Sequence, residues 1–154
     1  MFRYCVWYKI RNNHPINTLL RKNASLLNTA TFPAHVTIQH SLERKEEAVN
    51  MAKRFHQHEL PQLDLFSQPI LTHVTIDNTN FFSLEQLLLV NNKKIEGIHV
   101  SLAYSNRKLT PMEIACCMPE SSFNFVPEDL EVVVYHCKDK NPSKWHLVWT
   151  ATEK

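Results

Sequence analysis

Three short segments of the sequence begin with a histidine that is followed by a valine and then by a hydroxyl residue. They are HVTIQHS at 35–41, HVTIDNT at 73–79 and HVSLAYS at 99–105. In a β-strand, a histidine and the hydroxyl residue two positions later point to the same face. Any two of these segments would therefore bring two imidazoles and two hydroxyls together if their strands met.

The residues that follow each segment distinguish the three. At the same distances after His35 and after His99 come a ring-bearing residue, His40 or Tyr104, and then a serine. A helix is predicted soon after both serines, whereas the segment at 73 runs into a turn and another strand. We therefore predict that His35 and His99 belong to an internal repeat and form the site, with His73 as the alternative partner.

Two imidazoles and two hydroxyls suit phosphoryl transfer. A neutral imidazole takes a proton from the attacking oxygen, and a protonated one delivers a proton to the leaving oxygen. The imidazole pKa is near neutrality, so both forms coexist at working pH, and either histidine can take either role. The hydroxyls of Thr37 and Ser101 can donate hydrogen bonds to the non-bridging oxygens. We expect no metal and no cofactor, because the side chains handle both protons and charge.

The pattern along the chain predicts an α+β domain with a mostly antiparallel sheet. Strands are predicted at 3–10, 35–40, 98–104, 130–137 and 144–151, with two more inside 68–90 on either side of a turn at 77–80, and helices at about 15–27, 43–57 and 110–118. Thr110, Pro111 and Glu113 have the types expected of a capping box with a first-turn proline. A twofold repeat would place two sheets face to face around a cleft.

Length and composition indicate one globular domain over residues 1–154. The chain is 44% hydrophobic and 21% charged, with a net charge of +2, which is too small to predict a stable complex with nucleic acid. We find neither an export signal nor an apolar run of about 18 residues, so we expect a cytoplasmic monomer without membrane contact. The cysteines (Cys5, Cys116, Cys117 and Cys137) form no CxxC pair, and we expect reduced thiols.

The two paired segments resemble the signature of the two-histidine (2H) phosphoesterase superfamily, in which two H-x-[ST]-φ words lie on strands in the two halves of a domain. Four features are more specific: YCVWYKI at 4–10, FPAHVTI at 32–38, HVSLAYS at 99–105 and a late strand with Trp145. They look like the cyclic nucleotide phosphodiesterases associated with tRNA splicing. The resemblance spans most of the chain.

This resemblance implies a bilobal, pseudo-twofold fold in which two antiparallel sheets line a central cleft and helices lie outside. It implies metal-independent hydrolysis of a 2′,3′-cyclic nucleotide, or of ADP-ribose 1″,2″-cyclic phosphate, to a phosphomonoester. His35 and His99 would be the acid/base pair, and Thr37 and Ser101 would hold the phosphate. The substrate would be a nucleotide or a short oligonucleotide.

Further contacts to the substrate are expected from aromatic and basic residues. In that family the aromatic at the position of Tyr104 faces the ligand, but in a regular strand Tyr104 points away from the face of His99 and needs a bulge to reach the cleft. Either Trp7 or Tyr8 is expected to face the cleft. A basic rim is predicted from residues that follow the two motifs (Arg44, Lys45, Arg107 and Lys108), with His40 as a structural or rim residue.

Two alternative functions stay open at this point. The same chemistry would serve a 2′,5′-phosphodiesterase that cleaves 2′,5′-oligoadenylate or a cGAMP-type cyclic dinucleotide. The chain could instead be a non-catalytic module that binds a phosphate or an RNA end. The presence of both histidines and both hydroxyls argues against this module, because binding alone does not need two titrating groups.

Overall fold

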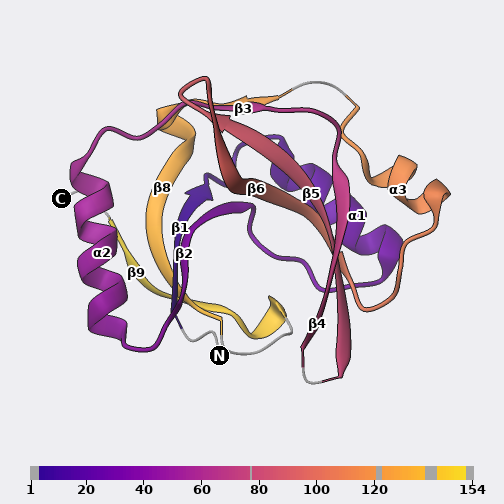
Figure 1. Ribbon diagram of the computed structural model, residues 1–154, viewed down its shortest axis with the longest axis horizontal. Coiled ribbons are helices and arrows are strands. Elements are labelled where there is room, and N and C mark those ends of the chain that lie inside the picture. The colour runs from indigo at the N-terminus through magenta and orange to yellow at the C-terminus, as the bar shows by residue number, and fades with distance from the viewer. Residues whose placement is uncertain (1–3, 77, 121–122, 138–141, 152–154) are drawn as a thin grey trace.

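The computed structural model describes residues 4–76, 78–120, 123–137 and 142–151 (Figure 1). The predicted α+β class is confirmed, since three α-helices accompany nine strands within these ranges. Residue 3, at the start of a predicted strand, and residue 77, in the predicted turn, lie outside the described residues.

The elements follow the predicted order closely. The strands are β1 (Tyr4–Ile10), β2 (His35–Leu42), β3 (Leu63–Leu65), β4 (Ile70–Ile76), β5 (Thr79–Val90), β6 (Lys93–Ser105), β7 (Asn124–Phe125), β8 (Leu130–His136) and β9 (His146–Thr150). The helices are α1 (Ile16–Leu27), α2 (Lys45–Gln57) and α3 (Pro111–Cys117), and two short 3-10 turns cover Pro127–Asp129 and Pro142–Lys144. The predicted capping box is confirmed, because the Thr110 hydroxyl accepts from the Glu113 amide and the Glu113 carboxylate accepts from the Thr110 amide.

Within the described ranges, the strands form one sheet in the order β7-β3-β5-β6-β2-β1-β8-β9, and β4 pairs with β5. The expectation of two separate sheets is wrong, because β2 and β6 pair directly where Val36 lies opposite Val100. This pairing puts the strands of the two histidine segments side by side at the centre of the sheet. Beyond β2 lie the three strands β1, β8 and β9, and beyond β6 lie four, with β5, β3 and β7 in line and β4 paired with β5.

Helices α1 and α2 cover the same face of the sheet. Leu20 of α1 belongs to the core with Val36 and Val100, while Ala48 of α2 packs against Val6 of β1. In Figure 1, α2 lies beside β8 and β9 on one side of the molecule, and α1 lies on the other side near β5 and β6. Because side chains alternate along a strand, the residues between these core positions point to the other face.

The β5–β6 hairpin is longer than the sequence predicted. It turns at Asn91 and Asn92, whose φ angles are 50° and 68°. Asparagine adopts this left-handed conformation more readily than most residues, and two such residues in a row are typical of a tight hairpin turn. The turn extends β6 back to Lys93, so that β5 runs alongside the whole histidine segment of β6.

The prediction of reduced thiols is wrong for one pair of cysteines. Cys5 and Cys137 are joined in a disulfide across 132 positions of sequence. The pairing of β1 with β8 brings them together, because Cys5 lies opposite Tyr135, two residues before Cys137. Cys116 and Cys117 are free. Separately, none of the helices in the described ranges has the length and apolar character needed to cross a membrane.

Candidate functional site

The four predicted side chains lie on one face of the central strand pair. Val36 and Val100 are opposite one another and point into the core under α1, at 1% and 0% exposure. Their neighbours in sequence, His35 with Thr37 and His99 with Ser101, consequently point to the face that α1 and α2 leave uncovered. In an antiparallel pair this register sets His35 beside Ser101 and Thr37 beside His99. The structure therefore brings together all four residues.

Both imidazoles are held in the same way. Nδ1 of His35 lies 2.8 Å from the carbonyl oxygen of Pro33, and Nδ1 of His99 lies 2.9 Å from that of Gly97. A carbonyl oxygen only accepts hydrogen bonds, so Nδ1 carries a proton in both rings. Nε2 is then the nitrogen that gains or loses a proton in each imidazole. Two histidines with their Nε2 atoms available on one face can exchange protons with a ligand placed between them.

Trp7 fixes the ring plane of His35. Their rings are stacked with centroids 3.5 Å apart and planes 12° from parallel. Tyr135 stacks on Trp7 with a centroid distance of 4.2 Å, and Trp145 meets His35 edge-on. Trp7 and His35 are both nearly buried, at 2% and 7% exposure. The stack therefore limits His35 to one orientation of its ring.

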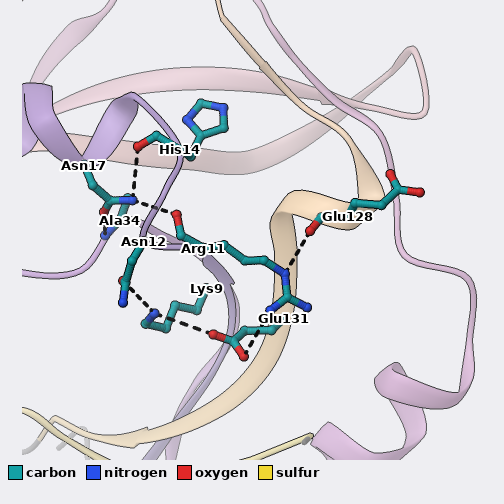
Figure 2. A network of polar contacts seen from close by, with 8 residues as sticks. All are labelled: Lys9, Arg11, Asn12, His14, Asn17, Ala34, Glu128 and Glu131. Atoms are coloured by element: carbon teal, nitrogen blue, oxygen red, sulfur yellow. Dashed lines mark hydrogen bonds and ion pairs between the residues drawn. The ribbon is translucent and has the colours of Figure 1, made fainter. Parts of the chain in front are cut away.

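The backbone just before His35 is also fixed. The Ala34 carbonyl accepts from the Ile10 amide at 2.9 Å, and the Ala34 amide donates to the side-chain oxygen of Asn17 at 3.3 Å. Figure 2 shows Asn17 between Ala34 and the connection from β1 to α1, where its amide nitrogen also donates to the Arg11 carbonyl at 2.9 Å. Asn17 thus connects the start of α1 to the strand that carries His35.

Burial changes the proton affinity of His35. Loss of hydration lowers the pKa of the His35 imidazole from 6.5 to about 4. The hydrogen bond to the Pro33 carbonyl works against this change, and the positive charge of a protonated His99 adds to it. His35 is therefore neutral at physiological pH in the unliganded protein. The influence of His99 also means that the two rings are close enough to interact electrostatically.

His99 has a different environment from His35. Its side chain is 30% exposed, and its Nε2 lies 3.5 Å from Oε2 of Glu85 on the neighbouring strand β5. That separation is longer than a hydrogen bond but within reach of an ion pair when His99 is protonated. The two imidazoles are thus differentiated by their surroundings, one desolvated and one beside a carboxylate.

Gly97 is the only glycine in the chain, and its carbonyl oxygen accepts the hydrogen bond that holds the His99 ring. Its φ is +87°, a conformation that other residues adopt only with strain. We expect Gly97→Ala to lower the free energy of unfolding by about 1–3 kcal/mol and to weaken the hydrogen bond from His99 Nδ1, because the strained backbone turns the carbonyl away from His99. Urea titration and the ring ¹⁵N resonances of His99 measure the two effects.

Asn28→Ala is the matched control for this substitution. Asn28 also has a left-handed φ, 57°, but it ends α1. It is expected to lose stability without a change in the ring ¹⁵N resonances of His99. If these resonances in Gly97→Ala match those in Asn28→Ala, then the Gly97 carbonyl does not orient His99.

Tyr104 reaches the site face through a bulge, as the sequence required. Ser101 lies opposite Glu85 and Tyr104 lies opposite Ser83, so β6 has one residue more than β5 between these pairs. Burial raises the pKa of the Tyr104 phenol, a hydrogen bond with Ser101 lowers it, and the charge of Glu85 raises it again. Ser83 and Ser101 share a hydrogen bond of 3.1 Å. Ser101 is therefore surrounded by hydroxyl groups.

Other predicted residues lie away from this cluster. Tyr8 lies opposite Val36 and meets Phe55 of α2, so it is on the helix-covered face, and of the two rings predicted to face the cleft only Trp7 is on the site face. His73 is exposed on β4, where it stacks on Phe82 and contacts Asn80 at 2.9 Å. The structure does not bring Tyr8 or His73 to the paired histidines.

The predicted basic rim and His40 lie at the surface. The Arg107 guanidinium makes two contacts of 2.8 and 2.6 Å with the Glu113 carboxylate, and this partner holds the pKa of Glu113 at about 2. Arg107 therefore supports the cap of α3. His40 is exposed, with Nδ1 2.8 Å from the Ser41 hydroxyl. Arg44, Lys45 and Lys108 are exposed as well.

Comparison with protein-family models, curated proteins and solved structures found no match. A function can therefore be argued only from the residues of the chain itself.

One cavity of about 260 Å³ lies away from the histidines. Its lining comes from the connection between β3 and β4, from β5 and from the segment after α3 (Leu65, Ser67, Gln68, Pro69, Gln86, Met118, Pro119 and Glu120). Gln86 is its most buried side chain, and the Gln86 amide nitrogen donates to the carbonyls of Phe66, Ser67 and Leu87. This cavity contains none of the predicted site residues.

Three residues of the cluster were missed from the sequence. Ser83 and Glu85 are polar residues two positions apart in the otherwise apolar strand FFSLEQLLLV, a pattern that could have indicated one polar face. Gly97, two residues before His99, could have indicated a special backbone conformation. Among the described residues, no group of three or more metal-binding side chains is gathered at one point.

Proposed function

We propose that the protein is a phosphodiesterase that hydrolyses a 2′,3′-cyclic nucleotide or ADP-ribose 1″,2″-cyclic phosphate to a phosphomonoester. One observation carries the proposal: His35 and His99 are oriented identically through Nδ1, which leaves both Nε2 atoms for proton transfer beside the hydroxyls of Thr37 and Ser101. Proton transfer at two points and stabilisation of non-bridging oxygens are what hydrolysis of a phosphodiester requires.

The surroundings of the two rings support different roles. His35 is the general base, because its low pKa of about 4 keeps it neutral before the substrate arrives. The negative charge of a bound phosphodiester favours the imidazolium, so binding raises the proton affinity of His35 toward the range of an effective base. His99 is the general acid, because its Nε2 lies 3.5 Å from the Glu85 carboxylate, which can form an ion pair with the imidazolium.

The reaction then proceeds in one displacement with two proton transfers. His35 Nε2 accepts a proton from water while the water oxygen attacks phosphorus. The bond from phosphorus to the leaving ester oxygen breaks, and His99 Nε2 gives that oxygen a proton. Thr37 and Ser101 donate hydrogen bonds to the non-bridging oxygens as charge builds there. His35 afterwards loses its proton to solvent and His99 regains one.

The bilobal, pseudo-twofold fold of the 2H phosphoesterases is part of the proposal. It is supported by the central place of the β2–β6 pair in the sheet, with three strands beyond β2 and four, counting β4, beyond β6. It is supported also by the matching bonds from each histidine to the carbonyl two residues earlier. In both halves the histidine strand leads to a helix, α2 after β2 and α3 after β6.

A panel of substrates tests the function. The purified chain is incubated, with EDTA present, with 2′,3′-cyclic mononucleotides, ADP-ribose 1″,2″-cyclic phosphate, 2′,5′-oligoadenylate and 2′,3′-cGAMP, and the products are separated. We expect the cyclic phosphates to be converted to monoesters at undiminished rates, because the proton transfers use only side chains. Loss of all turnover on chelation would contradict the metal-independent mechanism.

The other members of the panel separate the remaining functions. Turnover confined to 2′,5′-oligoadenylate or cGAMP would point to the 2′,5′-phosphodiesterase. Binding of the cyclic phosphates without any turnover would point to the non-catalytic module.

A further inference from the structure

Glu85 is a carboxylate inside a site proposed to bind phosphate. It lies on the same face as the histidines, directly opposite Ser101 in the β5–β6 ladder. Its side chain is only 18% exposed. A phosphate site usually gathers cations and hydrogen-bond donors, because the ligand is negative. A partly buried negative charge at this position therefore affects which ligands the site binds.

Neighbouring groups hold Glu85 in place. The Thr72 hydroxyl on β4 donates to Oε2 at 2.9 Å, and His99 Nε2 on β6 lies 3.5 Å from the same oxygen. The Tyr104 phenol is close enough for the charge of Glu85 to contribute to its raised pKa. The hydrogen bond from Thr72 is the shorter of the two contacts to Oε2 of Glu85. Glu85 can therefore lie beside His99 and still leave the Nε2 of His99 available to donate to a ligand.

The lysine opposite His35 in the sheet is already compensated. Lys9 lies opposite His35 in the β1–β2 ladder, on the site face. Its amine is 3.6 Å from the Glu131 carboxylate and donates to Asn12 at 3.2 Å (Figure 2). Protonated His99 is likewise balanced by Glu85. A ligand with one negative charge is suited to such a face, whereas a second negative charge on the ligand would be repelled by Glu85.

We propose that Glu85 is a positioning and specificity residue: it holds the His99 ring in place and makes the site favour a singly charged phosphodiester over a doubly charged phosphomonoester. This inference rests on the proposed function, in which the diester is the substrate and the monoester is the product. Glu85 then also hastens product release, since hydrolysis of the diester adds a negative charge that the carboxylate repels.

Two small phosphate esters test the inference. Dimethyl phosphate has one negative charge, and methyl phosphate has close to two at pH 8, because the second pKa of a phosphate monoester is about 6. Binding of each is followed through the ring ¹⁵N resonances of His35 and His99. We expect the wild-type protein to prefer dimethyl phosphate. Glu85→Gln should bind methyl phosphate about tenfold more tightly relative to dimethyl phosphate, the effect of removing one close like charge.

Two variants separate charge from structure. Glu85→Asp keeps the carboxylate and should retain most of the preference for dimethyl phosphate. Glu113→Gln removes an ion-paired carboxylate from the cap of α3, outside the site, and should leave the preference unchanged.

The outcomes distinguish the two proposals. If neither ester perturbs the ring resonances of His35 and His99, the paired histidines do not bind phosphate and the proposed function fails. If both esters bind but Glu85→Gln leaves their relative affinity unchanged, the inference about Glu85 is overturned while the function stands. An equal change of relative affinity in Glu113→Gln would also overturn the inference about Glu85. The effect would then come from the net charge of the protein and not from a carboxylate inside the site.

Discussion

Replacing His35 or His99 with glutamine is expected to lower kcat for the cyclic phosphodiester by about 10²- to 10⁴-fold in each case. Each substitution removes one of the two proton transfers and leaves the hydroxyls of Thr37 and Ser101 in place. Glutamine keeps a polar side chain of similar length, so the packing against Trp7 changes less than with alanine. Steady-state kinetics with the best substrate of the panel measures the loss.

His73→Gln is the matched control for these two variants. His73 begins the third His-Val-Thr/Ser segment, but it lies on β4 and contacts Phe82 and Asn80. Its replacement is expected to leave kcat within about twofold of the wild-type value, since loss of a surface contact has little effect on chemistry. A large loss in His73→Gln, or full activity in either of the other variants, would mean that the wrong pair has been chosen.

An activated substrate separates the base from the acid. A nitrophenyl phosphodiester has a leaving group that departs without a proton, so it bypasses the general acid. His99→Gln should hydrolyse this ester within about tenfold of the wild-type rate, whereas His35→Gln should remain impaired because water still needs a base. The reverse pattern would exchange the two roles that burial of His35 and the proximity of Glu85 to His99 suggest.

Local patterns in the sequence were sufficient for much of the fold. The cap at Thr110 was predicted from three residues, because a capping box is formed by groups within a single turn. The shared face of His35 with Thr37, and of His99 with Ser101, followed from the alternation of a strand. These features depend on neighbours in sequence, which is why one sequence is enough to predict them.

Features that depend on long-range pairing were not predictable in the same way. Val36 pairs directly with Val100, so that one sheet forms where two were expected. The sequence of neither strand alone indicates this pairing. The disulfide joins Cys5 to Cys137 only because β1 pairs with β8. The position of Glu85 beside His99 depends on the turn at Asn91 and on bulges in the β5–β6 ladder. A single sequence does not specify such registers.

The second large effect is expected in the stability of the protein at acid pH. Burial holds the pKa of His35 at about 4 in the folded protein, against 6.5 for the free side chain. Between these values the unfolded chain binds a proton that the folded protein excludes, so stability is lost as pH falls from about 6.5 to about 4. The contribution of His35 to this loss is about 3 kcal/mol, from about 1.4 kcal/mol per unit of pKa.

Urea unfolding between pH 7 and pH 4, followed by tryptophan fluorescence, measures this contribution. We expect the free energy of unfolding of the wild-type protein to fall by about 3 kcal/mol more than that of His35→Gln, because glutamine has no proton to exclude. His73→Gln removes an exposed imidazole and should run parallel to the wild-type curve. Parallel curves for His35→Gln and wild type would mean that His35 is hydrated, and the basis for choosing it as the neutral base would be lost.

A bound anion should restore part of the stability that the protein loses at acid pH. Dimethyl phosphate stays singly charged over this pH range, so its charge does not change during the titration. If it sits between the histidines, its negative charge favours protonated His35 and offsets the cost of burying that charge. The protein should then be stabilised more by this ester at pH 5 than at pH 7, and His35→Gln should not show the difference. Equal stabilisation at both pH values would mean that the ester binds away from His35, which connects this stability measurement to the proposed site.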